Sequence, residues 1–132
     1  MSKTIDTLLS PLQADDKLKG AIISLSFLIM FADKSVGNEE ASSIDTILKE
    51  HAFKDKSVFP QFVASAKIIS LEALKNEKEE NKFILDCVKN LHEKKNKAEV
   101  LYLIKHIGLA NKKVSEKESV IIEKIHKCVN SI

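Results

Sequence analysis

Apolar residues recur every three or four positions along most of the chain, which is the spacing of one face of an α-helix. Residues 81–94 give the clearest case, with Phe83, Ile84, Cys87, Val88 and Leu91 at this spacing. No segment alternates apolar and polar residues for long enough to be a convincing strand. The pattern therefore predicts an all-α fold.

Caps and prolines predict where the helices begin and end. We expect a short helix around 3–10, ended by Pro11, and a second helix that is capped by Asp15 or Asp16 and runs to about Phe31. Proline fits the first turn of a helix, so Pro60 predicts the start of another. The further expected helices cover about 38–50, 60–74, 81–94, 97–109 and 116–130. These elements make a single-domain bundle of six to seven helices spanning residues 1–132.

The stretch AIISLSFLIMFA (21–32) is apolar almost all round, so the helix that contains it should be buried on most sides. It is too short to span a bilayer, and Lys19 and Asp33 flank it. The N-terminus has no signal-peptide architecture. We therefore expect a cytoplasmic protein without a transmembrane segment.

Composition narrows the function classes. The 132 residues are 44% hydrophobic and 30% charged, which is typical of a globular domain. The formal net charge is only +2, and every basic residue is Lys. The chain therefore lacks arginine, whose guanidinium group usually makes the bidentate contacts to phosphates and bases. This argues against specific nucleic-acid binding. Cys87 and Cys128 lack CxxC spacing, which favours buried thiols in a reducing compartment over a disulfide.

The chain resembles itself when it is shifted by 78 residues, so that 25–47 lies over 103–125. A lone valine, Val36 or Val114, then occupies the same loop position in both copies. We expect each valine to fill the gap between two helices. The shift predicts an internal helix–loop–helix duplication about a pseudo-twofold axis, with units at about 17–50 and 97–130. The identical pairs are Leu25/Leu103, Ile29/Ile107, Ala32/Ala110, Lys34/Lys112, Val36/Val114, Glu40/Glu118, Ile44/Ile122 and Ile47/Ile125.

The loops of the two units carry acidic residues that have more than one explanation. Ser115 and Glu118 have the spacing of a capping box, and Glu40 occupies the position equivalent to Glu118. Asp33 follows a buried helix, where the helix dipole disfavours a negative charge. Backbone N–H groups, a lysine, or a divalent cation shared with Glu40 would each compensate it. An EF-hand is excluded, because its glycine and its final glutamate would fall on Asn38 and Ile44.

The segments FADKSVGNEEASSI and LANKKVSEKESVII resemble the paired A-D-G-x-V-x-x-x-E units of the TerB-like tellurite-resistance family, whose domain also begins a membrane-anchored DnaJ-type co-chaperone. The resemblance covers residues from about 17 to 130. It implies an all-helical duplicated fold, a role in stress or tellurite resistance, and divalent-metal binding through acidic loop residues. Those metal ligands would be Asp33, Glu40 and Glu118. The chain departs from the family pattern at Lys34, Lys112 and Asn111, which weakens the implied metal site.

Other candidate chemistry is sparse. No GxSxG, P-loop, HExxH or GxGxxG motif occurs, and the histidines and cysteines lack zinc-site spacing. The stretches NEKEENK (76–82) and HEKKNK (92–97) alternate in charge sign, which fits a solvated face with i,i+4 ion pairs, or a docking surface for a charged partner. The leading prediction is a non-enzymatic TerB-like module that binds a partner protein and, weakly, a divalent cation. A plain helical adaptor without metal and an all-helical enzyme without short motifs stay as alternatives.

Overall fold

The computed structural model describes residues 4–32, 49, 53–91, 97–109 and 115–131. Within these ranges the secondary structure is helical and contains no strand, which confirms the predicted all-α fold. The helix expected over 38–50, with the loop residues Asp33, Val36 and Glu40, lies outside the described residues. The described helices are α1 (Ile5–Leu9), α2 (Ala14–Met30), α4 (Phe59–Ala73), α5 (Glu77–Lys89), α6 (Lys97–Leu109) and α7 (Glu116–Asn130).

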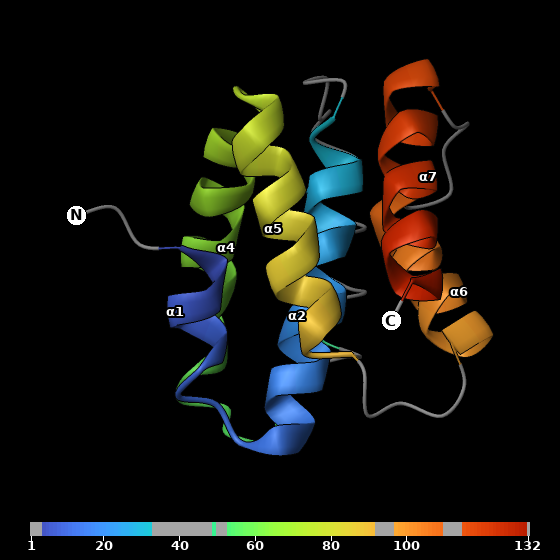
Figure 1. The fold of residues 1–132 in the computed structure, drawn as a ribbon. Coiled ribbons are helices and arrows are strands. Elements are labelled where there is room, and N and C mark those ends of the chain that lie inside the picture. Colours follow the sequence, from blue (N-terminus) through green and yellow to red (C-terminus); the bar gives the residue numbers. More distant parts are fainter. Residues whose placement is uncertain (1–3, 33–48, 50–52, 92–96, 110–114, 132) are drawn as a thin grey trace.

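Helix α2 is the centre of the bundle and contacts each of the other five described helices (Figure 1). Every side chain from Ala21 to Phe31 is buried, as the apolar sequence of this stretch predicts. Helices α1, α4 and α5 pack on one another on one side of α2, and α6 and α7 pack together on the other. None of the helices in the described ranges is long and apolar enough to cross a membrane.

The helix ends follow their local sequence. Thr4 and Thr7 form a capping box at α1, and Asn76 caps α5 by accepting hydrogen bonds from two backbone N–H groups. The predicted capping box of Ser115 and Glu118 is confirmed at α7. Pro60 lies in the first turn of α4, as expected. Helix α5 begins at Glu77, four residues before the predicted start, because the Asn76 cap precedes the apolar repeat.

The predicted cap of α2 is wrong. Gln13 occupies the cap position, and Asp15 and Asp16 lie in the first helical turn. The Asp16 carboxylate is buried and accepts hydrogen bonds from the backbone N–H groups of Lys54, at 2.9 Å, and Asp55, at 3.3 Å. Asp16 therefore ties the segment before α4 to the start of α2, a role that needs tertiary contacts and leaves no local pattern.

Gly20 lets α1 and α4 approach α2 closely. A Cβ atom added at Gly20 would lie 3.0 Å from a methyl carbon of Leu9 and 3.0 Å from the ring of Phe62. It would also lie 3.2 Å from the ring of Phe53. These separations are tighter than most contacts in packed interiors, so a side chain at this position would push the helices apart. The close approach helps to set the spacing between α1 and α4.

Candidate functional site

The sequence-predicted metal ligands are only partly within the described residues. Asp33 and Glu40 lie outside them, whereas Glu118 is completely buried at the start of α7. Its Oε1 accepts a hydrogen bond from the Ser115 N–H at 2.9 Å, and its own N–H donates to Ser115 Oγ at 3.2 Å. In the described part of the chain, no group of three or more His, Cys, Asp or Glu residues is arranged to hold a metal ion. Glu118 thus has a structural role as a cap, and metal binding stays a prediction.

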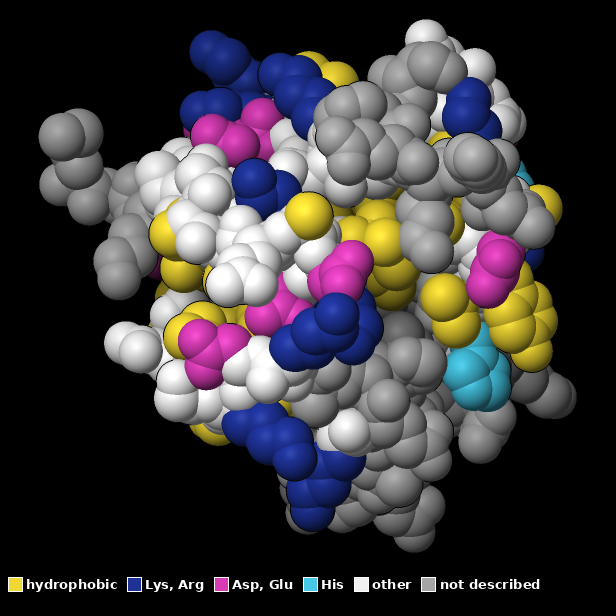
Figure 2. All heavy atoms as spheres, turned by 90° about the horizontal axis from the view of Figure 1, so that it is seen from below, with side chains coloured by type: hydrophobic (Ala, Val, Ile, Leu, Met, Phe, Trp, Pro, Cys, Tyr) yellow, Lys and Arg dark blue, Asp and Glu magenta, His cyan; other side chains and the backbone are white. Residues whose placement is uncertain are grey.

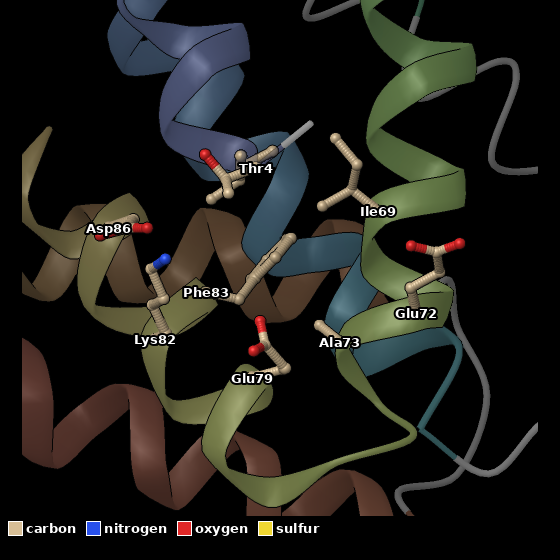
Figure 3. A pocket seen from close by; sticks show the side chains of 9 residues that line it. Thr4, Ile69, Glu72, Ala73, Glu79, Lys82, Phe83 and Asp86 are labelled. Atoms are coloured by element: carbon tan, nitrogen blue, oxygen red, sulfur yellow. The ribbon is translucent and has the colours of Figure 1, made fainter. Parts of the chain in front are cut away.

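A groove of about 270 Å³ lies between α1, α4 and α5 (Figure 3). Ile5, Ala73 and Phe83 contribute buried apolar atoms to it, and the half-buried Ile69 adds to this apolar surface. Polar side chains complete the lining. The complete lining set is Thr4, Ile5, Ile69, Glu72, Ala73, Glu79, Lys82, Phe83 and Asp86.

Helix geometry explains why the polar residues of α5 converge on this groove. Glu79, Lys82 and Asp86 are spaced by three and four residues, so they share one face of the helix. The Phe83 side chain lies in the middle of the view in Figure 3, with Glu72 of α4 on one side and Asp86 on the other. The groove therefore combines an apolar floor with charged groups from two helices.

Acidic groups outnumber basic ones in the lining, since Glu72, Glu79 and Asp86 face a single lysine, Lys82. Burial raises the pKa of the Asp86 carboxyl above its ordinary value, and the nearby charge of Asp6 on α1 raises it further. Lys82 and Lys89 act in the opposite direction and favour the charged form of Asp86. The groove therefore favours an additional positive charge next to Asp86.

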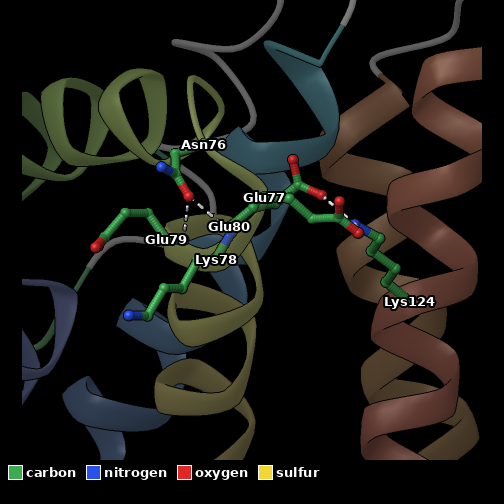
Figure 4. Close-up of polar contacts among 6 residues, drawn as sticks. All are labelled: Asn76, Glu77, Lys78, Glu79, Glu80 and Lys124. Carbon is green, nitrogen blue, oxygen red and sulfur yellow. Dashed lines mark hydrogen bonds and ion pairs between the residues drawn. The ribbon is translucent and has the colours of Figure 1, made fainter.

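The other charged residues of the NEKEENK stretch do not face the groove. Lys124 of α7 lies 2.7 Å from Glu80 Oε1 and 3.8 Å from Glu77 Oε1 (Figure 4). These contacts join α5 to α7, so the predicted solvated face is in part an interhelical ion-pair site. Glu79 and Lys82 of the same stretch line the groove, which fits the alternative prediction of a docking surface.

Charges of both signs are mixed among the described residues on one face of the bundle. Figure 2, which shows the bundle from below, has Lys and acidic side chains side by side without a continuous patch of either sign on that face. The cysteines are free thiols, with Cys87 buried and Cys128 half-buried. Burial raises the pKa of both thiols, that of Cys87 far more. Both should therefore be weak nucleophiles at neutral pH.

Each buried polar side chain in the described ranges bonds to the main chain. Ser24, Ser26 and Ser70 donate to the carbonyl four residues earlier in their own helices. Asp16 and Glu118 accept from backbone N–H groups, as described above. These five residues are all the buried polar side chains in this part of the protein, and each has a structural use.

The comparisons with known proteins return nothing that assigns a family. No family model, curated protein or solved structure matches this chain. The candidate site therefore rests on its geometry. The sequence pattern did not identify the groove as a site, although Glu79, Lys82 and Asp86 at helical spacing were a usable signal for a charged face on α5.

Proposed function

We propose that this chain is a non-enzymatic, TerB-like helical module of the cytoplasm that acts by binding a partner protein in stress or tellurite resistance. The observation that carries the binding role is the groove between α1, α4 and α5, with its apolar floor and acidic lining. Exposed apolar surface is costly to leave in water, and charged groups beside it give specificity to the binding of a partner.

The groove volume of about 270 Å³ is close to the lower end of the range of about 300–1,000 Å³ typical of small-molecule sites, so the volume does not separate a small ligand from one side chain of a protein partner. The sequence contains no GxSxG, P-loop, HExxH or GxGxxG motif, which supports a non-enzymatic role.

The resemblance of the loops to TerB-like units supports a separate proposal, that Asp33 and Glu40 bind a divalent cation. Calorimetric titration of the chelator-treated protein with Ca²⁺, Mg²⁺, Mn²⁺ and Zn²⁺ tests it. We expect a saturable heat that Asp33→Ala removes. No heat, or equal heats from wild type and variant, would rule the loop site out and favour an adaptor that binds no metal.

Position-specific photo-crosslinking in the native cells tests the protein-binding role. One photoreactive residue replaces Lys75, which is exposed in the turn after α4, three residues from the groove-lining Glu72, and another replaces the exposed Lys127 on α7 as the control. We expect a discrete protein adduct at position 75 only, whose partner also binds the purified chain. Absence of an adduct at position 75, or the same adducts at both positions, would contradict the proposal.

A further inference from the structure

We propose that the groove between α1, α4 and α5 receives a basic side chain, Lys or Arg, from a segment of the partner protein. This inference rests on the proposed protein-binding function and adds the chemistry of the partner. It follows from the shape of the groove, the placement of its charges and the apolar surface beside it.

The shape suits a long basic side chain. The methylene stems of Lys and Arg pack on apolar surface while their charged ends stay at the rim. In the groove, Phe83 and Ile69 supply such a surface, and carboxylates stand beside them (Figure 3). A purely apolar side chain would leave these carboxylates without an opposite charge, and an acidic one would be repelled by them.

The negative charges come from separate helices and border the groove at more than one place. Glu72 belongs to α4, whereas Glu79 and Asp86 belong to α5, on the other side of the floor. Asp6 of α1 adds negative charge close to Asp86. Lys82 is the one cation in the lining and opposes this attraction in part, so removing its charge should strengthen the binding of a basic group.

Asp86 lies where its negative charge is disfavoured. Burial and the charge of Asp6 both raise the pKa of its carboxyl. Binding sites often contain residues whose charge lowers the stability of the fold, because function there competes with stability. The position of Asp86 on the face of the groove fits this pattern. A bound cation would remove this unfavourable interaction.

An exposed isoleucine indicates what flanks the basic residue. Ile68 is 60% exposed and lies four residues before Glu72, so it sits one turn away on the same face of α4. It therefore adds exposed apolar surface on α4 one turn from the groove-lining Glu72. The partner segment should therefore carry an apolar side chain next to its basic one.

Amide shift mapping of the full ¹⁵N-labelled chain tests the proposal. The probe is the peptide acetyl-Ala-Leu-Lys-Ala-amide, and the same peptide with norleucine in place of lysine removes only the charge. We expect saturable shifts centred on Thr4, Ile69, Glu72, Phe83 and Asp86 with the lysine peptide. The norleucine peptide should bind at least several-fold more weakly.

Charge variants make the test specific to the groove. Asp86→Asn and Glu79→Gln should each weaken binding of the lysine peptide about twofold to fivefold, the usual effect of one exposed ion pair. Lys82→Gln should strengthen it by a similar factor. Glu123→Gln on α7 removes an exposed carboxylate far along the chain from the groove and should leave the affinity unchanged.

The outcomes separate this inference from the proposed function. Shifts outside the groove, equal binding of the two peptides, or tighter binding of spermidine than of the lysine peptide would overturn the basic-segment assignment. A crosslinked partner together with any of these results would leave the protein-binding function standing and refute only the chemistry proposed for the groove. Binding of the lysine peptide with no crosslinked partner would support the groove chemistry and count against the protein-binding role.

Discussion

Ser26 Oγ donates a hydrogen bond of 3.2 Å to the main-chain oxygen of Ile104, and the two residues are 78 positions apart. This separation equals the shift that aligns the two halves of the sequence. The contact joins α2 to α6, and a pseudo-twofold axis between these helices would bring equivalent positions together in this way. The duplication itself stays a prediction, because most of the loops that define it lie outside the described residues.

Substitution of Ser26 measures the strength of this link. Ser24 and Ser26 each donate 2.7 Å bonds within α2, to Gly20 and Ile22, but only Ser26 also bonds to α6. We expect Ser26→Ala to lower the free energy of unfolding by about 0.5–1.5 kcal/mol more than Ser24→Ala, the net value of one hydrogen bond. Urea unfolding of both variants measures the difference. Equal losses would mean that the bond to Ile104 adds nothing.

The ion pairs between α5 and α7 should differ in strength. Glu80 lies 2.7 Å from Lys124 with a side chain that is 12% exposed, whereas Glu77 lies 3.8 Å away and is 79% exposed. We expect Glu80→Gln to cost about 1 kcal/mol of unfolding free energy and Glu77→Gln only a few tenths. Denaturant unfolding at low and high salt checks this, since the Glu77 contribution should vanish first in salt. A larger loss from Glu77→Gln would contradict the assignment.

The thiols should react in a fixed order. Burial raises the pKa of both, and Cys87 is fully buried whereas Cys128 is half-buried. Iodoacetamide at pH 8, followed by mass spectrometry, should label Cys128 first, and both more slowly than a free thiol. Cys87 should react only when the fold opens, at a rate that follows the population of the open form. Faster labelling of Cys87 would show that α5 opens locally or packs differently.

Asp86 should make stability depend on pH in a defined direction. Its folded-state pKa lies above the ordinary value of 3.8, so the folded protein holds this proton more tightly than the unfolded chain does. The contribution of Asp86 to folding stability is therefore most favourable below pH 3.8. This stability is lost as the pH rises through the raised pKa of the folded state.

Replacing Asp86 by asparagine should therefore raise the thermal midpoint by about 1–3 °C at pH 7, which is the expected size for one weak charge effect. The gain should shrink as the pH falls toward 4. Calorimetry of wild type, Asp86→Asn and the control Glu123→Gln at both pH values measures it. A lower midpoint for Asp86→Asn at pH 7 would show that the carboxylate makes a stabilising contact instead.

Local sequence patterns predicted much of the fold, because helix periodicity and helix caps depend on residues that are close together in the sequence. The apolar spacing of Phe83 to Leu91, the crowded run around Ile29 and the Ser115 capping box each specify one helix or one helix end. The role of Asp16 was not predictable, since its hydrogen-bond donors, Lys54 and Asp55, lie far along the chain.

The groove was not predictable for the same reason. Its lining residues come from three helices, and their meeting depends on how α1 and α4 pack against α2 around Gly20. The helical spacing of the charged residues on α5 predicted a polar face. That face forms a groove only because α5 packs beside Glu72 of α4. Local sequence carries no information about that packing.

One comparison decides whether the groove is the binding surface. The affinity of the crosslinked partner is measured for wild type, Glu79→Lys and Glu123→Lys, since the two variants change net charge equally on α5 and α7. We expect Glu79→Lys to weaken binding about tenfold, through loss of one attraction and gain of one repulsion, while Glu123→Lys stays within about twofold of wild type. Equal affinities for Glu79→Lys and wild type would place the binding surface elsewhere on the protein.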